Sequence, residues 1–498
     1  MTALATPPQA ADSAAPGSAL SPSAAGPASP DEPAGLPAGP PLPPLAQALR
    51  FSVRPMAFQL SAARRYGDVW TMRIPMRRGG FVVTSHPDHV RSLMSADPAD
   101  APSLTGESPL RPILGPNSVL TSVGERHLRQ RKLLLPAFHG EAVARYVEMI
   151  AEVAERDIDG WPIGEPFPLA PRMQAVTLEV IMRGVLGIEP AAAADTPEEL
   201  LRQTVRRLLA ASTHPAYRLL ELRNAGRSEA RGLLARMIAR VDRRLYAVIA
   251  RRRLEAASPG HRERDDVLSM LLAARDDDGE PLTDRELRDE LLSLVLAGHE
   301  TTANSLAWTF ERLLRTPAAY DRLRELARGD DEEVAAAFVE ATIHEGMRAR
   351  PVIPMVVRLV ERPWRLGPHV LPAGTATAVG IIALHHRPDV YPRPSSFEPE
   401  RFLAQRQPDD SGGERLDEAG CRVFARPGTY TWLPFGGGIR RCLGATLALA
   451  EQRVVLRAIA RRVDLVAPSP APEPPRMRNV TMIPRDGCLV RVAHRRAG

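Results

Sequence analysis

A glycine-rich segment near the C-terminus carries the residue with the most distinctive chemistry, Cys442. Residues 435–444 read Phe-Gly-Gly-Gly-Ile-Arg-Arg-Cys-Leu-Gly, and an apolar helical pattern over 445–462 follows at once. A cysteine just before a helix N-terminus lies where backbone N–H groups and the helix dipole favour its thiolate form. Successive glycines can adopt conformations closed to other residues, so the loop can bring the sulfur close to a flat ligand. Cys442 is therefore a candidate metal ligand, although a lone cysteine in such a loop is more often a buried structural residue.

A second set of polar residues interrupts the strongest predicted helix, which runs from about 283 to 314 and opens with a Thr-Asp-Arg-Glu capping box. Residues 297–302 read Ala-Gly-His-Glu-Thr-Thr inside an otherwise apolar run. The Thr301 hydroxyl can donate to the carbonyl of Ala297, so a local opening of the helix is expected, and it could hold a water and dioxygen. An ordinary core helix in which His299 and Glu300 are paired with neighbours remains the alternative.

Two further pairs of charged residues share helix faces. His127 and Arg131 are four residues apart in a basic helix predicted over 124–138, and Glu345 and Arg348 are three apart in a later helix. By itself, the first pair is most simply a solvated basic face. A lone Glu-x-x-Arg motif also indicates little.

Taken together, and in their order along the chain, the four motifs resemble those of the cytochrome P450 family, in the form found in soluble bacterial members. The resemblance covers almost everything from about residue 45 to residue 492. It implies a mainly α-helical fold with a small β-rich portion, the cytochrome P450 fold. It also implies a non-covalent haem b (iron protoporphyrin IX), since the chain has no Cys-x-x-Cys-His motif.

The resemblance implies a role for each matched residue. Cys442 would be the axial thiolate ligand of the iron, and Glu300 and Thr301 would be the acid and the alcohol that deliver protons to bound oxygen. The helix after the loop would approach closely at Gly444. The haem would be bound by His127, Arg131, Ala297, Arg358, Phe435, Gly436, Arg440 and Gly444. A buried ion-pair network would consist of Glu345, Arg348 and Arg401. The substrate pocket would be lined by Leu294, Val295, Ile353, Met355 and Val356.

The implied reaction is monooxygenation of a lipophilic small molecule by dioxygen. The apolar pocket residues suit a fatty acid, a terpenoid or a polyketide. The chain shows no flavin or nicotinamide motif, so a ferredoxin with its ferredoxin reductase is the expected electron donor. It is expected to dock on a basic patch of Arg129, Lys132 and Arg441. A peroxide-driven peroxygenase is one alternative, although such enzymes typically lack the acid–alcohol pair, and a haem-binding sensor or carrier is another.

Composition argues against several other classes of protein. The net charge of +6 on 498 residues allows a nucleic-acid binder, but the scattered arginines lack interleaved aromatic residues, so no nucleic-acid partner is expected. No run of about 18 apolar residues predicts a membrane span. The three cysteines lie far apart and form no Cys-x-x-Cys motif, which indicates a reducing, cytoplasmic location.

Residues 1–45 are almost entirely Ala, Pro, Ser and Gly, a composition that predicts a disordered tail before a single domain over 46–498. Three β-hairpins are expected inside that domain. The first pairs 69–74 with 81–84, the second spans 364–382, and the third spans 480–492 with its turn at Asp486-Gly487.

Overall fold

The computed structural model describes residues 23–29, 32, 34–75, 77–104, 108, 110–138, 141–190, 193, 195–212, 214–224, 226–258, 264–406, 414–416, 422–424 and 428–496. The helices are α1 (Pro44–Val53), α2 (Pro55–Tyr66), α3 (Pro87–Met94), α4 (Arg111–Leu114), α5 (Gly124–Leu134), α6 (Glu141–Ala144), α7 (Val147–Asp159), α8 (Leu169–Gly184), α9 (Pro197–Ser212), α10 (Pro215–Asn224), α11 (Gly232–Ala256), α12 (Val267–Ala273), α13 (Asp284–Leu313), α14 (Pro317–Arg328), α15 (Glu332–Ala349), α16 (Ile381–His385) and α17 (Ala445–Arg462). The strands are β1 (Ala25–Pro27), β2 (Val69–Ile74), β3 (Arg77–Thr84), β4 (Pro166–Pro168), β5 (Met355–Val360), β6 (Trp364–Leu366), β7 (His369–Leu371), β8 (Thr375–Gly380), β9 (Glu414–Leu416), β10 (Arg422–Phe424), β11 (Val463–Val466), β12 (Pro475–Arg478), β13 (Thr481–Pro484) and β14 (Leu489–Arg495).

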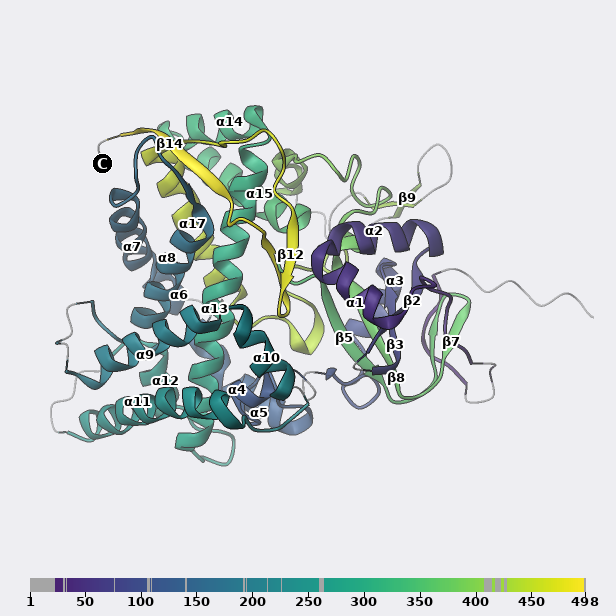
Figure 1. Ribbon diagram of the computed structural model, residues 1–498, viewed down its shortest axis with the longest axis horizontal. Coiled ribbons are helices and arrows are strands. Elements are labelled where there is room, and N and C mark those ends of the chain that lie inside the picture. The colour runs from purple at the N-terminus through teal and green to yellow at the C-terminus, as the bar shows by residue number, and fades with distance from the viewer. Residues whose placement is uncertain are drawn as a thin grey trace, which may run out of the picture.

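Most helices gather in one large helical portion, and a smaller portion is built on a four-stranded sheet covered by α1 and α2 (Figure 1). The strand order is β2-β3-β8-β5. Strands β2 and β3 form the antiparallel hairpin that the sequence predicts, β3 runs parallel to β8, and β5 runs antiparallel to β8. The mainly α-helical class with a small β-rich portion is confirmed.

Helix α13 runs through the helical portion and packs against α8, α15 and α17 (Figure 1). Its start is the predicted capping box, because the Thr283 hydroxyl accepts from the Glu286 N–H and the Glu286 carboxylate accepts from the Thr283 N–H. Every residue from Thr302 to Phe310 is buried. The helix therefore forms the core of this portion, and α17, which follows the Cys442 loop, packs directly on it.

The expected tail over 1–45 is wrong for its second half. Strand β1 pairs antiparallel with β6, and the Thr71 hydroxyl donates to the carbonyl of Pro37 at 2.6 Å. The buried Gln47 amide donates to the carbonyls of Pro40 and Leu42. This proline-rich segment needs no apolar core of its own, because backbone hydrogen bonds to the sheet portion hold its extended conformation. Residues 1–22 lie outside the described residues.

In two of the expected hairpins, the strands pair differently from the prediction. Strand β6 pairs with β7, whereas β8 after the 372–374 turn pairs with β5 and β3. Near the C-terminus, β12 pairs with β13 around Asn479 and Val480, and β14 pairs instead with β11 and β4. Asn479 has a φ of 54°, a left-handed conformation that asparagine tolerates better than most residues, and this permits the two-residue turn. Among the residues described, no helix is both long and apolar enough to cross a membrane.

Candidate functional site

The loop before α17 folds back on itself around two glycines. Gly436 and Gly438 have φ values of 68° and 63°, and the Cys442 N–H donates to the carbonyl of Phe435 at 2.9 Å. A Cβ at Gly438 would lie 1.9 Å from the carbonyl oxygen of Met94, so only glycine fits there. Gly437, by contrast, has ordinary extended backbone with a φ of −150°. The predicted glycine-hinged loop is confirmed at two of its three glycines.

Cys442 lies three residues before the first residue of α17 and keeps accessible surface. Nevertheless, burial raises the pKa of its thiol, while a hydrogen bond from the Gly444 backbone and the charges of Arg131 and Arg441 act in the opposite direction. The thiol is thus accessible although protein atoms surround it. The Gly444 backbone at the start of α17 favours the thiolate, as the sequence predicts, and burial acts against it.

Gly444 borders open space. A Cβ at this position would meet no protein atom within 4 Å outside its chain neighbours, and the expected close approach of the following helix stays a prediction. The space beside Cys442 is open in this direction.

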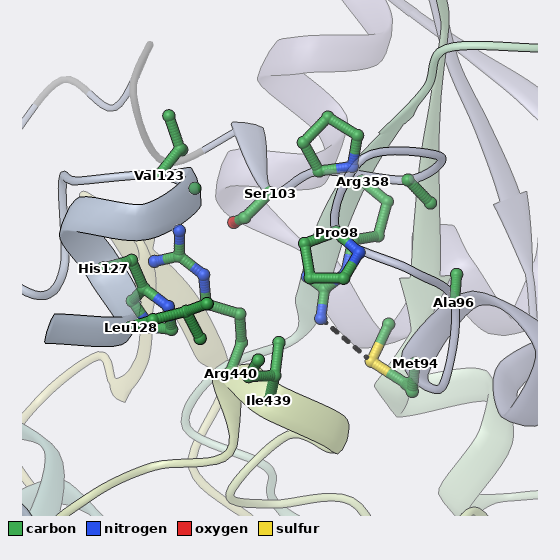
Figure 2. Close-up of a pocket in the computed structure, with 13 residues that line it drawn as sticks. Met94, Ala96, Pro98, Ser103, Val123, His127, Leu128, Arg358, Ile439 and Arg440 are labelled. Atoms are coloured by element: carbon green, nitrogen blue, oxygen red, sulfur yellow. Dashed lines mark hydrogen bonds between the residues drawn. The ribbon is translucent and has the colours of Figure 1, made fainter. Parts of the chain in front are cut away.

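Positively charged side chains gather on one side of this loop, and none of them pairs with a carboxylate among the described residues. Arg358 is 6% exposed and donates to Met94 Sδ at 3.5 Å and to the carbonyl of Val357. Arg440 donates to the carbonyls of Val119 and Ser122. Burial lowers the pKa of each guanidinium to about 10. Figure 2 shows both arginines around one pocket.

Two helical residues complete this group. His127 of α5 lines the same pocket, and burial, with Arg440 nearby, lowers its pKa to about 3. Arg131, one turn further along α5, donates to the carbonyl of Arg441 at 2.8 Å. No carboxylate within the described ranges pairs with His127, Arg131, Arg358 or Arg440. The structure thus brings together three arginines and the neutral His127, the four basic side chains that the sequence singles out, and their N–H groups are suited to a ligand with carboxylate groups.

The middle of α13 is partly exposed, and three of its partly exposed residues form a stripe along one face. Leu294, Ala297 and Thr301 are partly exposed and share one face by their spacing of three and four residues. The Thr301 hydroxyl donates to the carbonyl of Ala297 at 2.6 Å, as predicted. This stripe can therefore border a bound molecule.

Glu300 is fixed by residues that sequence reasoning missed. Its Oε1 accepts from Arg478 Nε at 2.8 Å and from the Thr481 hydroxyl at 2.9 Å, both at the β12–β13 turn. These partners are 178 and 181 residues away in the sequence. Asn479 lies between these two partners and has a positive φ. Its residue type, which tolerates this conformation, is the local signal from which the turn could have been predicted.

The buried ion-pair network has the predicted members. Glu345 and Arg348 are fully buried, and Arg348 Nε donates to Glu345 Oε2 at 2.6 Å while Nη2 donates to Oε1 at 2.8 Å. Arg401 Nε donates to Glu345 Oε1 at 3.2 Å. His385, which the sequence analysis missed, connects this network to the loop: its carbonyl accepts from Arg348, and its Nε2 accepts from the Leu433 N–H. The network therefore anchors the segment that enters the Cys442 loop.

The predicted pocket residues do not form one cluster. Leu294 and Val295 pack into the cluster shared by α9, α11 and α13, and Val295 is 2% exposed. Met355 packs with Trp70 in a second cluster and Val356 in a third. Ile353 is partly buried. Their shared role as a substrate wall stays a prediction.

The expected basic patch is largely neutralised. Arg129 pairs with Asp276 and Glu286, and Lys132 pairs with Asp277. Arg441 is exposed. Of the three expected cations, only this one lacks a carboxylate partner within the part of the chain that the structure describes.

These features fit a haem and its surroundings. The soft sulfur donor is accessible, open space flanks Gly444, and arginines that have no carboxylate partner among the described residues are placed where carboxylate groups could be bound. Together with the helical fold, they define a haem-thiolate protein.

The comparisons give the particular family. The cytochrome P450 family model matches residues 37–490, and the chain belongs to the cytochrome P450 family. Putative cytochrome P450 135B1 of Mycobacterium tuberculosis is 37% identical over 464 residues, covering 92% of this chain and 91% of the relative. Putative cytochrome P450 137 of the same species is 37% identical over 437 residues, covering 87% and 84%.

Solved structures agree on the fold. The P450DA heme domain superposes with a TM-score of 0.72 at 23% identity, covering 93% of this chain and 98% of that one. Retinoic acid-bound cyanobacterial CYP120A1 gives 0.70 at 22% identity, covering 93% and 100%. The chain is thus a cytochrome P450 monooxygenase with haem b as its cofactor, as the sequence predicts.

Proposed function

We propose that this enzyme takes two electrons from an external protein donor and inserts one oxygen atom into a lipophilic small molecule. The observation that carries the proposal is the placement of Thr301 and Glu300 on α13. Thr301 lies on the accessible stripe of α13. The carboxylate of its neighbour Glu300 accepts a hydrogen bond from Arg478 of β12. An acid and an alcohol at this place serve oxygen chemistry, and a haem sensor or carrier would not need them.

Haem binding is assigned to residues of the Cys442 loop, α5, β5 and α13. Cys442 would supply the thiolate to the iron, Phe435 and Gly436 would shape the loop that carries it, and Ala297 would border the bound group. The two propionates would be bound by His127, Arg131, Arg358 and Arg440. Their carboxylates would supply the counter-charge for the three arginines. When bound, the haem supplies redox chemistry that the side chains themselves do not have.

The protein's contribution to the reaction is proton delivery. Overall, a substrate C–H bond, dioxygen, two electrons and two protons give a C–OH group and one water. The Thr301 hydroxyl, which now donates to the carbonyl of Ala297, would instead donate toward the oxygen site, and Glu300 would replace the proton from solvent. The apolar character of Leu294, Val295, Ile353, Met355 and Val356 supports a lipophilic substrate such as a fatty acid, terpenoid or polyketide.

A ferredoxin with its reductase is the proposed donor. Its acidic surface would meet exposed Arg441 and could displace Asp277 from Lys132, since both members of that pair are more than two-thirds exposed and such pairs contribute little. The absence of paired-cysteine motifs supports a cytoplasmic location.

The test is the absorption spectrum of the purified protein, reduced with dithionite and exposed to carbon monoxide. A strongly red-shifted Soret band is expected, and Cys442→His should abolish it while haem remains bound. A band typical of histidine or thiol ligation in the wild-type protein would contradict the assignment of Cys442.

The peroxygenase alternative is tested separately. Lipophilic compounds that shift the spectrum are incubated with ferredoxin, reductase and NADPH, or with hydrogen peroxide alone. Product formation that depends on the ferredoxin system is expected. Equal or faster turnover with peroxide alone would favour the peroxygenase.

A further inference from the structure

The carboxylate of Glu300 is bound asymmetrically. Both of its hydrogen bonds, from Arg478 Nε at 2.8 Å and from Thr481 Oγ1 at 2.9 Å, end on Oε1. Oε2 accepts no hydrogen bond from any residue that the structure describes, and the Glu300 side chain keeps 25% of its surface exposed. One oxygen is therefore anchored, while the other is accessible to water.

The anchor is itself rigid. The β12–β13 turn that carries Arg478 and Thr481 continues into Met482, which is fully buried. The carbonyl of Met482 accepts from Trp308 Nε1 at 3.0 Å, and its N–H donates to the carbonyl of Val352 at 2.6 Å. Since Trp308 lies on α13 eight residues after Glu300, the hairpin is attached to the same helix at two points. It can therefore hold the carboxylate in a fixed orientation.

The two anchoring bonds differ in strength. The bond from Arg478 is charge-assisted and so is the stronger kind. The Thr481 hydroxyl has one hydrogen and two acceptors within reach, Glu300 Oε1 and the carbonyl of Arg478 at 2.8 Å. Arg478 is thus the main anchor, and Thr481 is the secondary one.

We propose that Arg478 and Thr481 are positioning residues, which fix Oε1 of Glu300 so that Oε2 is presented for proton transfer. This inference rests on the proposed role of Glu300 as the acid of the proton path. Without the anchor, the carboxylate would rotate about its side-chain bonds and spend less time in the productive orientation. Dioxygen that has received two electrons and two protons without reaching substrate would then leave as hydrogen peroxide.

The experiment compares haem-loaded wild type, E300Q, R478M, T481V and the double variant E300Q/R478M. R476M is the matched control, because Arg476 is an exposed arginine on the same strand, β12. Each protein is reduced with a plant-type ferredoxin, its reductase and NADPH in the presence of a compound that shifts the spectrum and is oxidised by wild type, and hydrogen peroxide released per NADPH consumed is measured. We expect a several-fold rise in E300Q and R478M, a smaller rise in T481V and none in R476M. The double variant should release no more peroxide than E300Q alone.

A second readout does not depend on turnover. In thermal unfolding, the midpoint shifts of E300Q and R478M should not add in the double variant, because both remove the same interaction. Raised peroxide in E300Q with wild-type levels in R478M and T481V would overturn the anchoring role and leave the acid in place. Wild-type peroxide in E300Q itself would overturn the role of Glu300, and with it the anchor's purpose.

Discussion

Thr301 owes its proposed role to a hydrogen bond that can be exchanged. In the structure its hydroxyl donates to the carbonyl of Ala297, which already belongs to the helix ladder. Releasing that bond costs little, since the carbonyl keeps a helical partner. The Thr301 hydroxyl can therefore donate to the Ala297 carbonyl in the resting protein and to a bound molecule during the reaction.

We expect Thr301→Ala to shift electrons from product to hydrogen peroxide, because the hydroxyl that passes on the proton is lost. Removing one such proton-transfer group costs about 10²-fold or more in the step it serves. The measurement is peroxide and product per NADPH with a substrate that shifts the spectrum. Thr301→Ser is the control, since it keeps the hydroxyl and should retain most of the coupling. Full coupling in the alanine variant would remove Thr301 from the proton path.

At the scale of elements, the conformation of the Cys442 loop depends on its backbone contact with the end of α3. Gly438 has a positive φ, and its Cα faces the Met94 carbonyl at the end of that helix. The position of the sulfur is thus set by backbone contacts rather than by side-chain packing.

Gly438→Ala should displace this loop, because the new Cβ would lie 1.9 Å from a backbone oxygen that cannot move independently. We expect a large loss of the red-shifted carbon monoxide band per mole of protein. Gly67→Ala is the matched control, since Gly67 also has a positive φ, of 80°, but its Cβ would meet nothing within 4 Å. Equal haem retention in the two variants would mean that the contact with Met94 does not position the loop.

The Glu345–Arg348 pair connects α15 to the segment before the loop. Glu345→Gln leaves the guanidinium of Arg348 buried without its counter-charge, so a loss of about 3–5 kcal/mol in the free energy of unfolding is expected from urea titration. Glu400→Gln is the control, because Glu400 is 48% exposed in its pair with Arg322 and should cost about 1 kcal/mol at most. Similar losses in both variants would contradict a special role for the buried network.

The elements that could be predicted from the sequence are those with local signals. The capping box and long apolar run of α13 predict its bounds, and the glycines around Cys442 predict the loop. The ion-pair network could be placed only through the resemblance, because the spacing of Glu345 and Arg348 says nothing of Arg401.

The features that escaped prediction depend on pairing between distant segments. Strand β1 lies in a Pro- and Ala-rich stretch with no strand periodicity, and β6 supplies its hydrogen bonds. Arg478 reaches Glu300 only because Asn479 turns the chain left-handed. No local pattern encodes either contact.

At the scale of the whole molecule, the proposed docking of an electron donor would depend on positive side chains that are not paired with carboxylates of the protein itself. Arg441 is exposed beside the ligand loop, so Arg441→Glu should slow reduction by a ferredoxin several-fold and weaken its salt dependence. Arg64→Glu, an exposed change of equal charge on α2, is the control and should leave the rate unchanged. Equal rates for both variants, measured by stopped-flow reduction under carbon monoxide, would exclude this docking face.

The stability of the whole protein should depend on pH partly through the buried acid Glu451. Glu451 of α17 is 3% exposed, its Oε1 has no hydrogen-bond partner among the described residues, and burial raises its pKa from 4.5 to about 8. The folded state therefore holds a proton that the unfolded state has released between these values, so stability falls as pH rises from about 4.5 to about 8.

Glu451→Gln removes this proton uptake and should be more stable than wild type. Relative to wild type, its free energy of unfolding from urea titrations should gain about 2–3 kcal/mol more at pH 9 than at pH 6. Glu400→Gln, at the exposed position, should follow the wild-type pH dependence. If Glu451→Gln also follows it, then Glu451 is ionised in the folded protein across this range, and a partner must stabilise its charge.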